Sequence, residues 1–333
     1  MSRVLVARLD SDGDVLLAGP AIRAVAASAE VVLLVGPRGR QAAALLPGVA
    51  ETLVWRAPWI DPSPDPVDPS DVDGLVAAVR AARVSGAVVL TSFHQSALPL
   101  ALLLRLAGVG HVAAVSEDYP GSLLDVRHRL DDDLPEPERA LSTVAAAGFA
   151  LPPGDDGRLR VRTPLPPVSH RTGPGPYVVL HPGASVPARA WSPRRAAAAV
   201  EALTAAGRRV VVTGGPGEAA LTAAVAGPGT DLGGRTSFAE LAAVLAGADA
   251  VVVGNTGPAH LAAAVGTPVV SLFAPVVPAA RWAPYGVASV LLGDQHAPCR
   301  DSRATVCPVA GHPCLDSVTP EDVVAAVDKV VAA

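Results

Sequence analysis

Short apolar runs without alternation recur along this chain, and they constrain its fold more than any other feature. Each run is four or five residues long and consists mainly of Val, Leu and Ala. Strands that are apolar on both sides are typical of parallel sheets, whose two faces are covered by helices. The order strand, helix, strand, helix therefore predicts an α/β fold. The runs span residues 4–7, 31–35, 87–90, 112–115, 177–180, 210–213 and 250–253.

The length and the distribution of Pro and Gly indicate two domains. A chain of 333 residues is long for one domain and sufficient for two. Residues 151–176 are rich in Pro and Gly and are predicted to be a linker, with a short strand near residues 159–161. The predicted domains are residues 1–150 and 177–318. A final helix within 319–333 is expected to pack back on the first domain.

The segment Gly254-Asn-Thr-Gly-Pro-Ala-His260 follows a predicted buried strand and leads into an Ala-rich helix. The first N–H groups of such a helix are unpaired and attract phosphate. Thr256 can add a hydroxyl, and Gly257 lets the ligand approach closely. The alternative is an ordinary turn in which Thr256 caps the helix.

A second loop, His181-Pro-Gly-Ala-Ser185, also follows a buried strand and continues to Arg189 and Trp191. Arg189 could hold a phosphate through its planar guanidinium, while Gly183 and Ser185 supply backbone and hydroxyl contacts. The simpler reading of Arg189 is a solvated charge.

A third loop, Gly214-Gly-Pro-Gly-Glu218, connects the strand at residues 210–213 to a helix that begins at residue 219. The Glu218 carboxylate could accept hydrogen bonds from ribose hydroxyls, as acidic residues do in other nucleotide-binding folds. Alternatively, Glu218 is a first-turn acid that complements the helix dipole. Together the three loops fit a nucleoside diphosphate.

The first domain has a different loop. Arg8-Leu-Asp-Ser-Asp-Gly-Asp14 leads from the first strand into a helix predicted over residues 15–27. Asp14 is either the N-cap of this helix or a general base at the mouth of the sheet. Asp10 and Asp12 are candidate turn formers. A calcium loop fits poorly, because no glutamate ligand follows.

These motifs together resemble glycosyltransferase family 9, the heptosyltransferases. The resemblance runs from residue 3 to about residue 326 and rests on Gly13-Asp14, His181-Pro-Gly-Ala, Gly214-Gly-Pro-Gly-Glu218 and Asn-Thr-Gly-Pro-Ala-His260. It implies the GT-B architecture, in which two Rossmann-like domains with parallel sheets face each other across a cleft. It also implies an inverting, metal-independent transfer from a nucleotide-diphosphate sugar, often ADP-heptose, with no cofactor.

The resemblance assigns roles residue by residue. Asp14 matches the catalytic base, Glu218 the ribose-binding acid, and Thr256 with Gly257 the phosphate-binding turn. Arg189 stands where members commonly have Lys. His260 matches a recurring histidine, whose alternative role is a buried helix residue bonded to backbone.

Two positions depart from the family pattern. Asn255 replaces a usual Asp that is expected to bond sugar hydroxyls, which leaves the transferred sugar open. Ser185-Val186 lacks the paired hydroxyls of some members. The resulting set of donor-binding candidates is Gly183, Ser185, Arg189, Gly214, Glu218, Asn255, Thr256, Gly257 and His260.

The overall charge and the apolar segments restrict partners and location. A formal net charge of −5 gives no support for nucleic acid as a partner. The apolar run at residues 98–106 is too short to span a membrane, and the N-terminus has no signal-peptide core. We therefore expect a cytoplasmic protein whose partners are the donor and a glycan, lipid-linked or small-molecule acceptor. Acceptor contacts are expected from loops such as residues 57–70 and 117–129.

Cys299, Cys307 and Cys314 lie near His312 in the sequence. Structural packing is the favoured reading, and zinc or a disulfide are the alternatives. The resemblance implies no catalytic metal.

The sequence leaves other functions open. A catalytically silent nucleotide-sugar-binding module would keep the three donor loops and would not need Asp14. A nucleotide-sugar epimerase of the same architecture would need an acid/base set that the sequence does not display. A nicotinamide-dependent oxidoreductase is weakest, because no G-x-G-x-x-G motif follows the first strand.

Overall fold

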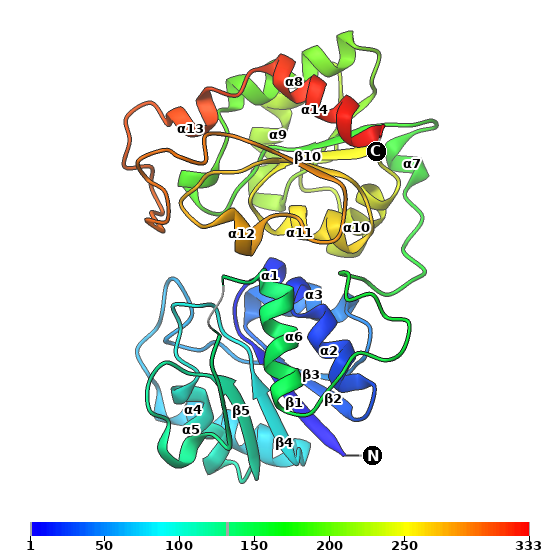
Figure 1. The fold of residues 1–333 in the computed structure, drawn as a ribbon. Helices are drawn as coiled ribbons and strands as arrows, with labels where there is room; N and C mark the ends of the chain where they lie inside the picture. The colour runs from blue at the N-terminus through cyan, green and yellow to red at the C-terminus, as the bar shows by residue number, and fades with distance from the viewer. Residues whose placement is uncertain (1, 131–132, 333) are drawn as a thin grey trace. The chain divides into compact units, whose positions relative to one another are not determined.

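The computed structural model describes residues 2–130 and 133–332. The chain divides into two compact units, Met1–Val161 and Arg162–Ala333 (Figure 1). The boundary falls inside the range predicted for the linker. Residues before it belong to the first unit, since Asp155 forms an ion pair with Arg23 at 2.6 Å and Leu159 is buried. No strand forms at residues 159–161.

The first unit contains a six-stranded, wholly parallel sheet in the order β3-β2-β1-β4-β5-β6. Its strands are β1 (Arg3–Arg8), β2 (Glu30–Val35), β3 (Val49–Val54), β4 (Gly86–Val89), β5 (His111–Val115) and β6 (Val126–His128). Its helices are α1 (Asp12–Leu17), α2 (Gly19–Ala26), α3 (Arg40–Leu45), α4 (Pro69–Ala82), α5 (Leu98–Leu106) and α6 (Glu136–Ala146), with 3₁₀ turns η1 (Pro37–Gly39) and η2 (Gly121–Leu123). On one face, Leu5 and Ala7 of β1 pack in the core with α4 and α5.

The single helix predicted over residues 15–27 is two helices in the structure. α1 ends at Leu17, and α2 begins at Gly19 with Pro20 in its first turn. Because proline has no N–H and its ring clashes with the preceding turn, it starts a helix more readily than it continues one. The short α1 places Asp14 at the carboxyl end of β1.

The second unit repeats this plan with the order β12-β11-β10-β7-β8-β9, again wholly parallel. Its strands are β7 (Val178–His181), β8 (Val210–Val212), β9 (Thr230–Asp231), β10 (Ala250–Gly254), β11 (Val269–Leu272) and β12 (Ser289–Leu292). Its helices are α7 (Ser169–Thr172), α8 (Pro193–Ala205), α9 (Ala219–Ala226), α10 (Phe238–Ala246), α11 (Gly257–Ala264), α12 (Ala279–Trp282), α13 (Pro313–Asp316) and α14 (Pro320–Val331), with 3₁₀ turns η3 (Pro187–Arg189) and η4 (Pro216–Glu218).

The final helix, α14, was expected to pack back on the first unit. Within the second unit its apolar face is buried, and it lies beside α8 (Figure 1). Val323, Val327 and Val330 belong to the same core as Val200 and Leu203 of α8. The apolar stripe of such a helix is buried against a neighbouring sheet. Periodicity alone could not identify which sheet that is.

Candidate active site

Each sheet has one point at which the order of its strands reverses. In the second unit this point lies between β7 and β10, and in the first between β1 and β4. Ligands of doubly wound α/β folds bind outside the carboxyl ends of the strands at such points. The predicted donor loops follow β7, β8 and β10, and the predicted base follows β1. The topology therefore places both predicted sites where such folds bind ligands.

The turn after β10 has the geometry expected of a helix start. Thr256 is the N-cap of α11 in extended conformation, and among the described residues its side chain makes no capping hydrogen bond. Its hydroxyl is thus not needed to cap the helix. The neighbouring loop lies close by, since a Cβ on Gly254 would stand 3.2 Å from the carbonyl oxygen of Arg189.

Asn255 is buried and joins the ends of two strands. Its Nδ2 donates to the carbonyl oxygen of Ala274 at 3.1 Å, and its Oδ1 accepts from the Ala274 N–H at 3.2 Å. This reciprocal pair uses one donor and one acceptor of the amide. A carboxylate could not donate in this way, so Asn at this position suits the bond to backbone.

Glu218 turns back from η4 toward the loop after β7. Its Oε2 accepts from the Gly215 N–H at 2.7 Å, and a Cβ on Gly183 would lie 1.9 Å from its Oε1. A side chain at position 183 would therefore displace the Glu218 carboxylate from this position. Thirty per cent of the Glu218 side chain remains exposed, which leaves it accessible to a ligand.

His181, the last residue of β7, was not among the predicted site residues. Its Nδ1 lies 3.0 Å from Oγ1 of Thr213 and its Nε2 3.8 Å from Oε2 of Glu218. Burial lowers the pKa of His181, and the nearby Glu218 carboxylate opposes this only in part. His181 is consequently neutral at pH 7 and lies beside Glu218. The sequence signal that could have identified His181 was its position at the end of a buried strand.

Arg189 is the last residue of η3. Its loop is held in place by hydrogen bonds with residues near the carboxyl end of the chain. The preceding residue, Ala188, donates its N–H to the Thr305 carbonyl oxygen at 2.9 Å. The carbonyl oxygen of Ala188 lies 3.1 Å from Nε2 of His312. Trp191 donates its indole N–H to Leu315 at 3.1 Å. The role of His312 in this structure is thus to support the Arg189 loop.

The three cysteines belong to the same core region as this support. Cys299 and Cys314 are buried, Cys307 is partly buried, and none of the three forms a disulfide. Burial and the neighbouring Cys299 and Cys307 raise the pKa of Cys314 to about 11. Within the described ranges, no group of three or more His, Cys, Asp or Glu side chains is arranged to hold a metal ion.

The other donor candidates lie in the same region. Gly214 packs closely, since a Cβ there would be 2.7 Å from Cγ2 of Thr222. Ser185 is exposed, Gly257 is the first residue of α11, and His260 is buried on α11 at 6% exposure.

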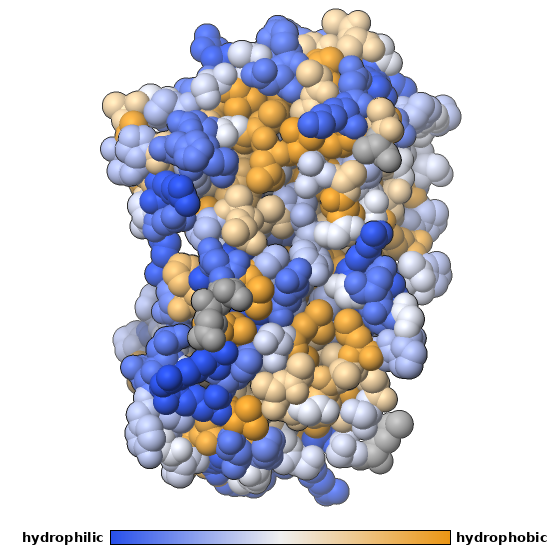
Figure 2. All heavy atoms as spheres, in the orientation of Figure 1, coloured by the Kyte–Doolittle hydropathy of each residue, from blue (hydrophilic) through white to orange (hydrophobic). Residues whose placement is uncertain are grey.

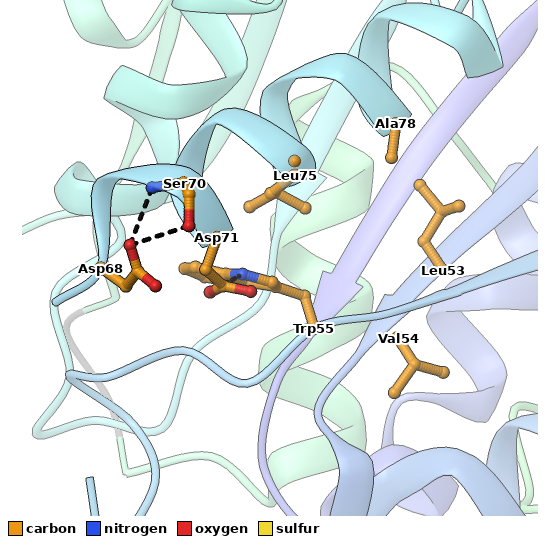
Figure 3. A pocket seen from close by; sticks show the side chains of 9 residues that line it. Leu53, Val54, Trp55, Asp68, Ser70, Asp71, Leu75 and Ala78 are labelled. Atoms are coloured by element: carbon orange, nitrogen blue, oxygen red, sulfur yellow. Dashed lines mark hydrogen bonds between the residues drawn. The ribbon is translucent and has the colours of Figure 1, made fainter. Parts of the chain in front are cut away.

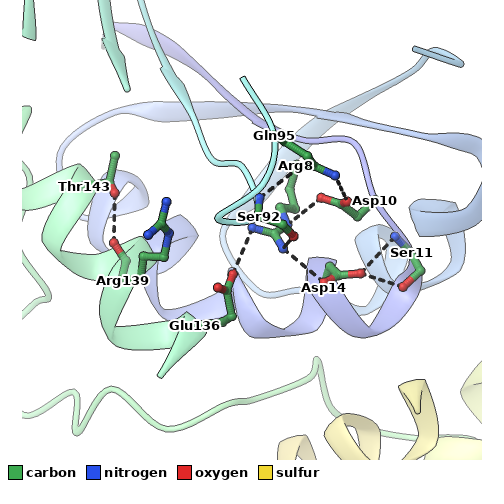
Figure 4. Close-up of polar contacts among 9 residues, drawn as sticks. All are labelled: Arg8, Asp10, Ser11, Asp14, Ser92, Gln95, Glu136, Arg139 and Thr143. Atoms are coloured by element: carbon green, nitrogen blue, oxygen red, sulfur yellow. Dashed lines mark hydrogen bonds and ion pairs between the residues drawn. The ribbon is translucent and has the colours of Figure 1, made fainter. Parts of the chain in front are cut away.

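In the first unit, Asp14 is not the N-cap of α1 but its third residue. Ser11 is the N-cap, and its backbone N–H and hydroxyl both donate to Oδ2 of Asp14, at 3.3 and 2.7 Å. The other carboxylate oxygen, Oδ1, lies 3.0 Å from Nη2 of Arg8 (Figure 4). The Asp14 side chain keeps 22% exposure, so one carboxylate is both fixed and reachable.

Arg8 connects Asp14 to two further carboxylates, although only 3% of it is exposed. Its Nε lies 3.0 Å from Asp10, its Nη1 3.3 Å from Glu136, and its Nη2 2.9 Å from the Ser92 hydroxyl (Figure 4). Burial opposes the charge of Arg8, but Asp10, Asp14 and Glu136 together raise its pKa, so it stays protonated. Arg8, Ser92 and Glu136 were not predicted as site residues. A charged residue that ends a buried strand was the signal for Arg8.

Asp10 and Asp12 differ from Asp14 in their surroundings. Asp10 accepts from Nε2 of Gln95 at 2.6 Å, and burial raises its pKa against the opposing effect of Arg8. Asp12 accepts from the Ala42 N–H at 2.8 Å and so links α1 to α3. Burial raises the pKa of Asp12 to about 6. Both therefore have structural contacts within the first unit.

Two surface cavities of the first unit lie near the carboxyl ends of its strands. One, of about 520 Å³, lies beside Trp55, whose indole N–H donates to Asp71 at 2.7 Å (Figure 3). Its walls come from the end of β3 and the start of α4. The other, of about 210 Å³, follows β4 and β5. It is lined by Phe93, His94, Gln95, Ser96, Val115, Ser116, Glu117, Asp118 and Arg139.

Two Rossmann-like α/β units, each with a six-stranded parallel sheet, define the GT-B class of glycosyltransferases. The chain belongs to the family described as glycosyltransferase family 9 (heptosyltransferase), which matches residues 94–311. It is a glycosyltransferase by this membership. No curated protein sequence matches the chain significantly.

Solved structures of this family share the fold. A glycosyl transferase family 9 protein from Veillonella parvula DSM 2008 superposes with a TM-score of 0.79 at 16% identity, over 99% of this chain and 97% of that one. E. coli ADP-heptose lps heptosyltransferase II gives 0.75 at 18% identity, over 100% and 99%. E. coli heptosyltransferase WaaC with ADP-2-deoxy-2-fluoro heptose gives 0.74 at 21% identity, over 98% and 99%. These similarities confirm the predicted fold class.

No helix within residues 2–130 and 133–332 is both long and apolar enough to cross a membrane. On the face shown in Figure 2, apolar side chains lie among hydrophilic ones in both units.

Proposed function

We propose that this protein transfers a sugar from a nucleotide-diphosphate sugar to an acceptor hydroxyl, with inversion at the anomeric carbon and without a metal ion. The observation that carries the proposal is the meeting of three polar loops at the carboxyl ends of the adjacent strands β10, β7 and β8. Arg189, Glu218 and the Thr256 turn each supply chemistry for one part of such a donor.

The donor is proposed to bind the second unit. Arg189 and the N-terminus of α11 supply positive charge for the diphosphate. Glu218, fixed by Gly215 and still accessible, suits the ribose hydroxyls. The structure of WaaC with an ADP-2-deoxy-2-fluoro heptose supports a similar, ADP-linked donor here. We propose a heptose or a related sugar as the transferred group.

The reaction is proposed to be a single displacement. Asp14 accepts the proton of the acceptor hydroxyl as its oxygen bonds to the anomeric carbon. The bond from that carbon to the diphosphate breaks on the opposite face, and the leaving group takes both electrons. Arg189 and the helix N-terminus stabilise its new charge. Inversion follows from the single displacement.

The acceptor is proposed to contact the first unit. This unit has 14 arginines and 20 acidic residues, a formal net charge of −6. The cavity with the exposed Phe93 also has Glu117 and Asp118 in its wall. Carboxylates can accept bonds from sugar hydroxyls, and an aromatic ring can pack on a sugar face. These features favour a hydroxyl-rich acceptor. As a separate point, we propose that the reaction takes place in the cytoplasm.

The test is a screen of purified protein with ADP-, UDP- and GDP-linked sugars, with release of nucleoside diphosphate as the readout. Slow release that increases with a sugar acceptor is expected for one donor class. Nucleoside diphosphate binding without any release would instead identify a silent binding module. EDTA should leave the rate unchanged, and a loss that Mg²⁺ or Mn²⁺ restores would contradict metal independence.

A further inference from the structure

Glu136 is a buried carboxylate that the proposed reaction does not yet use. It is the first residue of α6, only 2% exposed, with Oε2 lying 3.3 Å from Nη1 of Arg8 (Figure 4). A buried carboxylate is costly unless it is paired. Because so little of Glu136 is exposed within its unit, we infer that it acts through Arg8 rather than on a substrate.

Arg8 has two opposite effects on Asp14. Its ion pair at 3.0 Å fixes the direction of the Asp14 carboxylate, which helps a base to meet its proton. The same positive charge favours the ionised form of Asp14 and so makes it a weaker base. Orientation by an arginine alone would therefore reduce catalysis.

We propose that Glu136 is a positioning residue of the transfer reaction. By compensating the positive charge of Arg8 at its other terminal nitrogen, Glu136 allows Arg8 to orient Asp14 without making Asp14 a poor base. The proposal rests on the proposed function of Asp14 as the base. The proton that leaves the acceptor hydroxyl goes to Asp14, and Arg8 then remains paired with Glu136 and Asp10.

The charges around Arg8 agree with this role. Three carboxylates surround one guanidinium, which leaves an excess of negative charge. The groups that face this cluster come from four elements. They are Asp10, Asp12 and Asp14 around the start of α1, Arg38 of η1, the neutral Ser92 and Gln95 after β4, and Glu136 with Arg139 of α6.

The decisive comparison is between Glu136→Gln and Glu138→Gln. Glu138 lies on the same helix but is exposed, so the two variants lose the same charge at different places. Protein labelled with ¹³C at its aspartate carboxyl groups is titrated by NMR, and the Asp14 signal is identified by its absence in Asp14→Asn. Glu136→Gln should move the Asp14 midpoint to lower pH by roughly one unit, as expected for the loss of a nearby like charge. Glu138→Gln should not move it.

Kinetics give a second readout. In Glu136→Gln the acidic limb of the kcat profile should move to lower pH by the same amount, and the plateau should fall several-fold, because a weaker base transfers the proton less well. The KM for the donor should not change. A lower Tm with unchanged Asp14 midpoint and acidic limb would overturn the proposal and make Glu136 purely structural.

Failure to fold does not end the test. If Glu136→Gln does not fold, Glu136→Asp withdraws the charge from Arg8 by one methylene and should give a smaller shift in the same direction. No shift in that variant would also overturn the proposal. A wild-type protein without transfer activity would remove the proposed function, while the titration would still decide whether Glu136 controls Asp14.

Discussion

The carboxylate of Glu218 occupies the space that a side chain at position 183 would need. A Cβ on Gly183 would lie 1.9 Å from Oε1 and 2.7 Å from Oε2 of Glu218. Real atoms do not approach so closely, so the loop after β7 and the turn after β8 are matched as a pair. Gly183 therefore leaves the room that the Glu218 carboxylate occupies in the proposed donor site.

Gly183→Ala should displace Glu218 and weaken nucleotide binding about tenfold, since one charged hydrogen bond to the ribose would be lost. The fold should survive, because the flexible end of Glu218 can move. Calorimetry with ADP measures the effect. Gly217→Ala is the matched control, because a Cβ there meets nothing within 4 Å. Equal affinity in both variants would remove Glu218 from the donor site.

Arg189→Ala should weaken binding of the nucleoside diphosphate by about 1.5–3 kcal/mol, the usual contribution of a hydrogen bond to a charged group. Calorimetry with ADP again measures it. Arg194, exposed on α8, provides the control Arg194→Ala, which should bind normally. If Arg189→Ala also binds normally, Arg189 is a solvated loop residue.

The fold was predictable because its signals are local. Apolar runs such as residues 250–253 identify buried parallel strands, and the loops that follow them are where such folds bind ligands. β9, with two residues, and β6, with three, are too short to produce a periodic signal. The candidate donor residues were predicted by the same local logic, aided by the family resemblance.

The contacts that were missed are distant in sequence. Arg8 and Glu136 are 128 residues apart, and no local pattern pairs a strand-ending arginine with a helix-starting glutamate. Asp14 was predicted as a base or an N-cap, and the structure contradicts only the N-cap, because Ser11 caps α1 and Asp14 is the third residue of the capping box. Asp12 was predicted to be a turn former. The hydrogen bond that Asp12 accepts from Ala42 depends on where α3 packs.

Asn255→Asp should destabilise the second unit by about 1–3 kcal/mol at pH 8, because a carboxylate cannot donate to the Ala274 carbonyl oxygen. The loss of stability should be smaller at acidic pH, where the protonated carboxyl group can donate to the Ala274 carbonyl oxygen. Urea unfolding at pH 5 and pH 8 measures both effects. Gln295→Glu, at a less buried amide that donates to Phe273, should cost less. A variant as stable as the wild type would show that the Asn255 amide contributes little.

Asp12→Asn should change the dependence of stability on pH. Burial raises the pKa of Asp12 to about 6 from 3.8, so the folded state favours the protonated form. The stability that this form contributes is present below about pH 4 and is lost as the pH rises to about 6. Asn cannot ionise. Relative to the wild type, the variant should therefore gain about 2 kcal/mol between pH 4 and pH 8. Parallel stability curves would contradict the raised pKa.

Asp14→Asn separates a base from a structural carboxylate. Asn has nearly the same shape, and its one oxygen can still accept from the Ser11 N–H and hydroxyl, but its NH2 group cannot accept from Arg8 and it cannot take the acceptor proton. We expect kcat to fall roughly 10²- to 10⁴-fold with unchanged donor affinity. Because Arg8 keeps Asp10 and Glu136, the loss of stability should be moderate. Asp12→Asn, the same substitution in the same turn, should retain turnover. Near-normal kcat in Asp14→Asn would show that Asp14 serves only the capping box and the ion pair, and would make Asp10 the next candidate for the base.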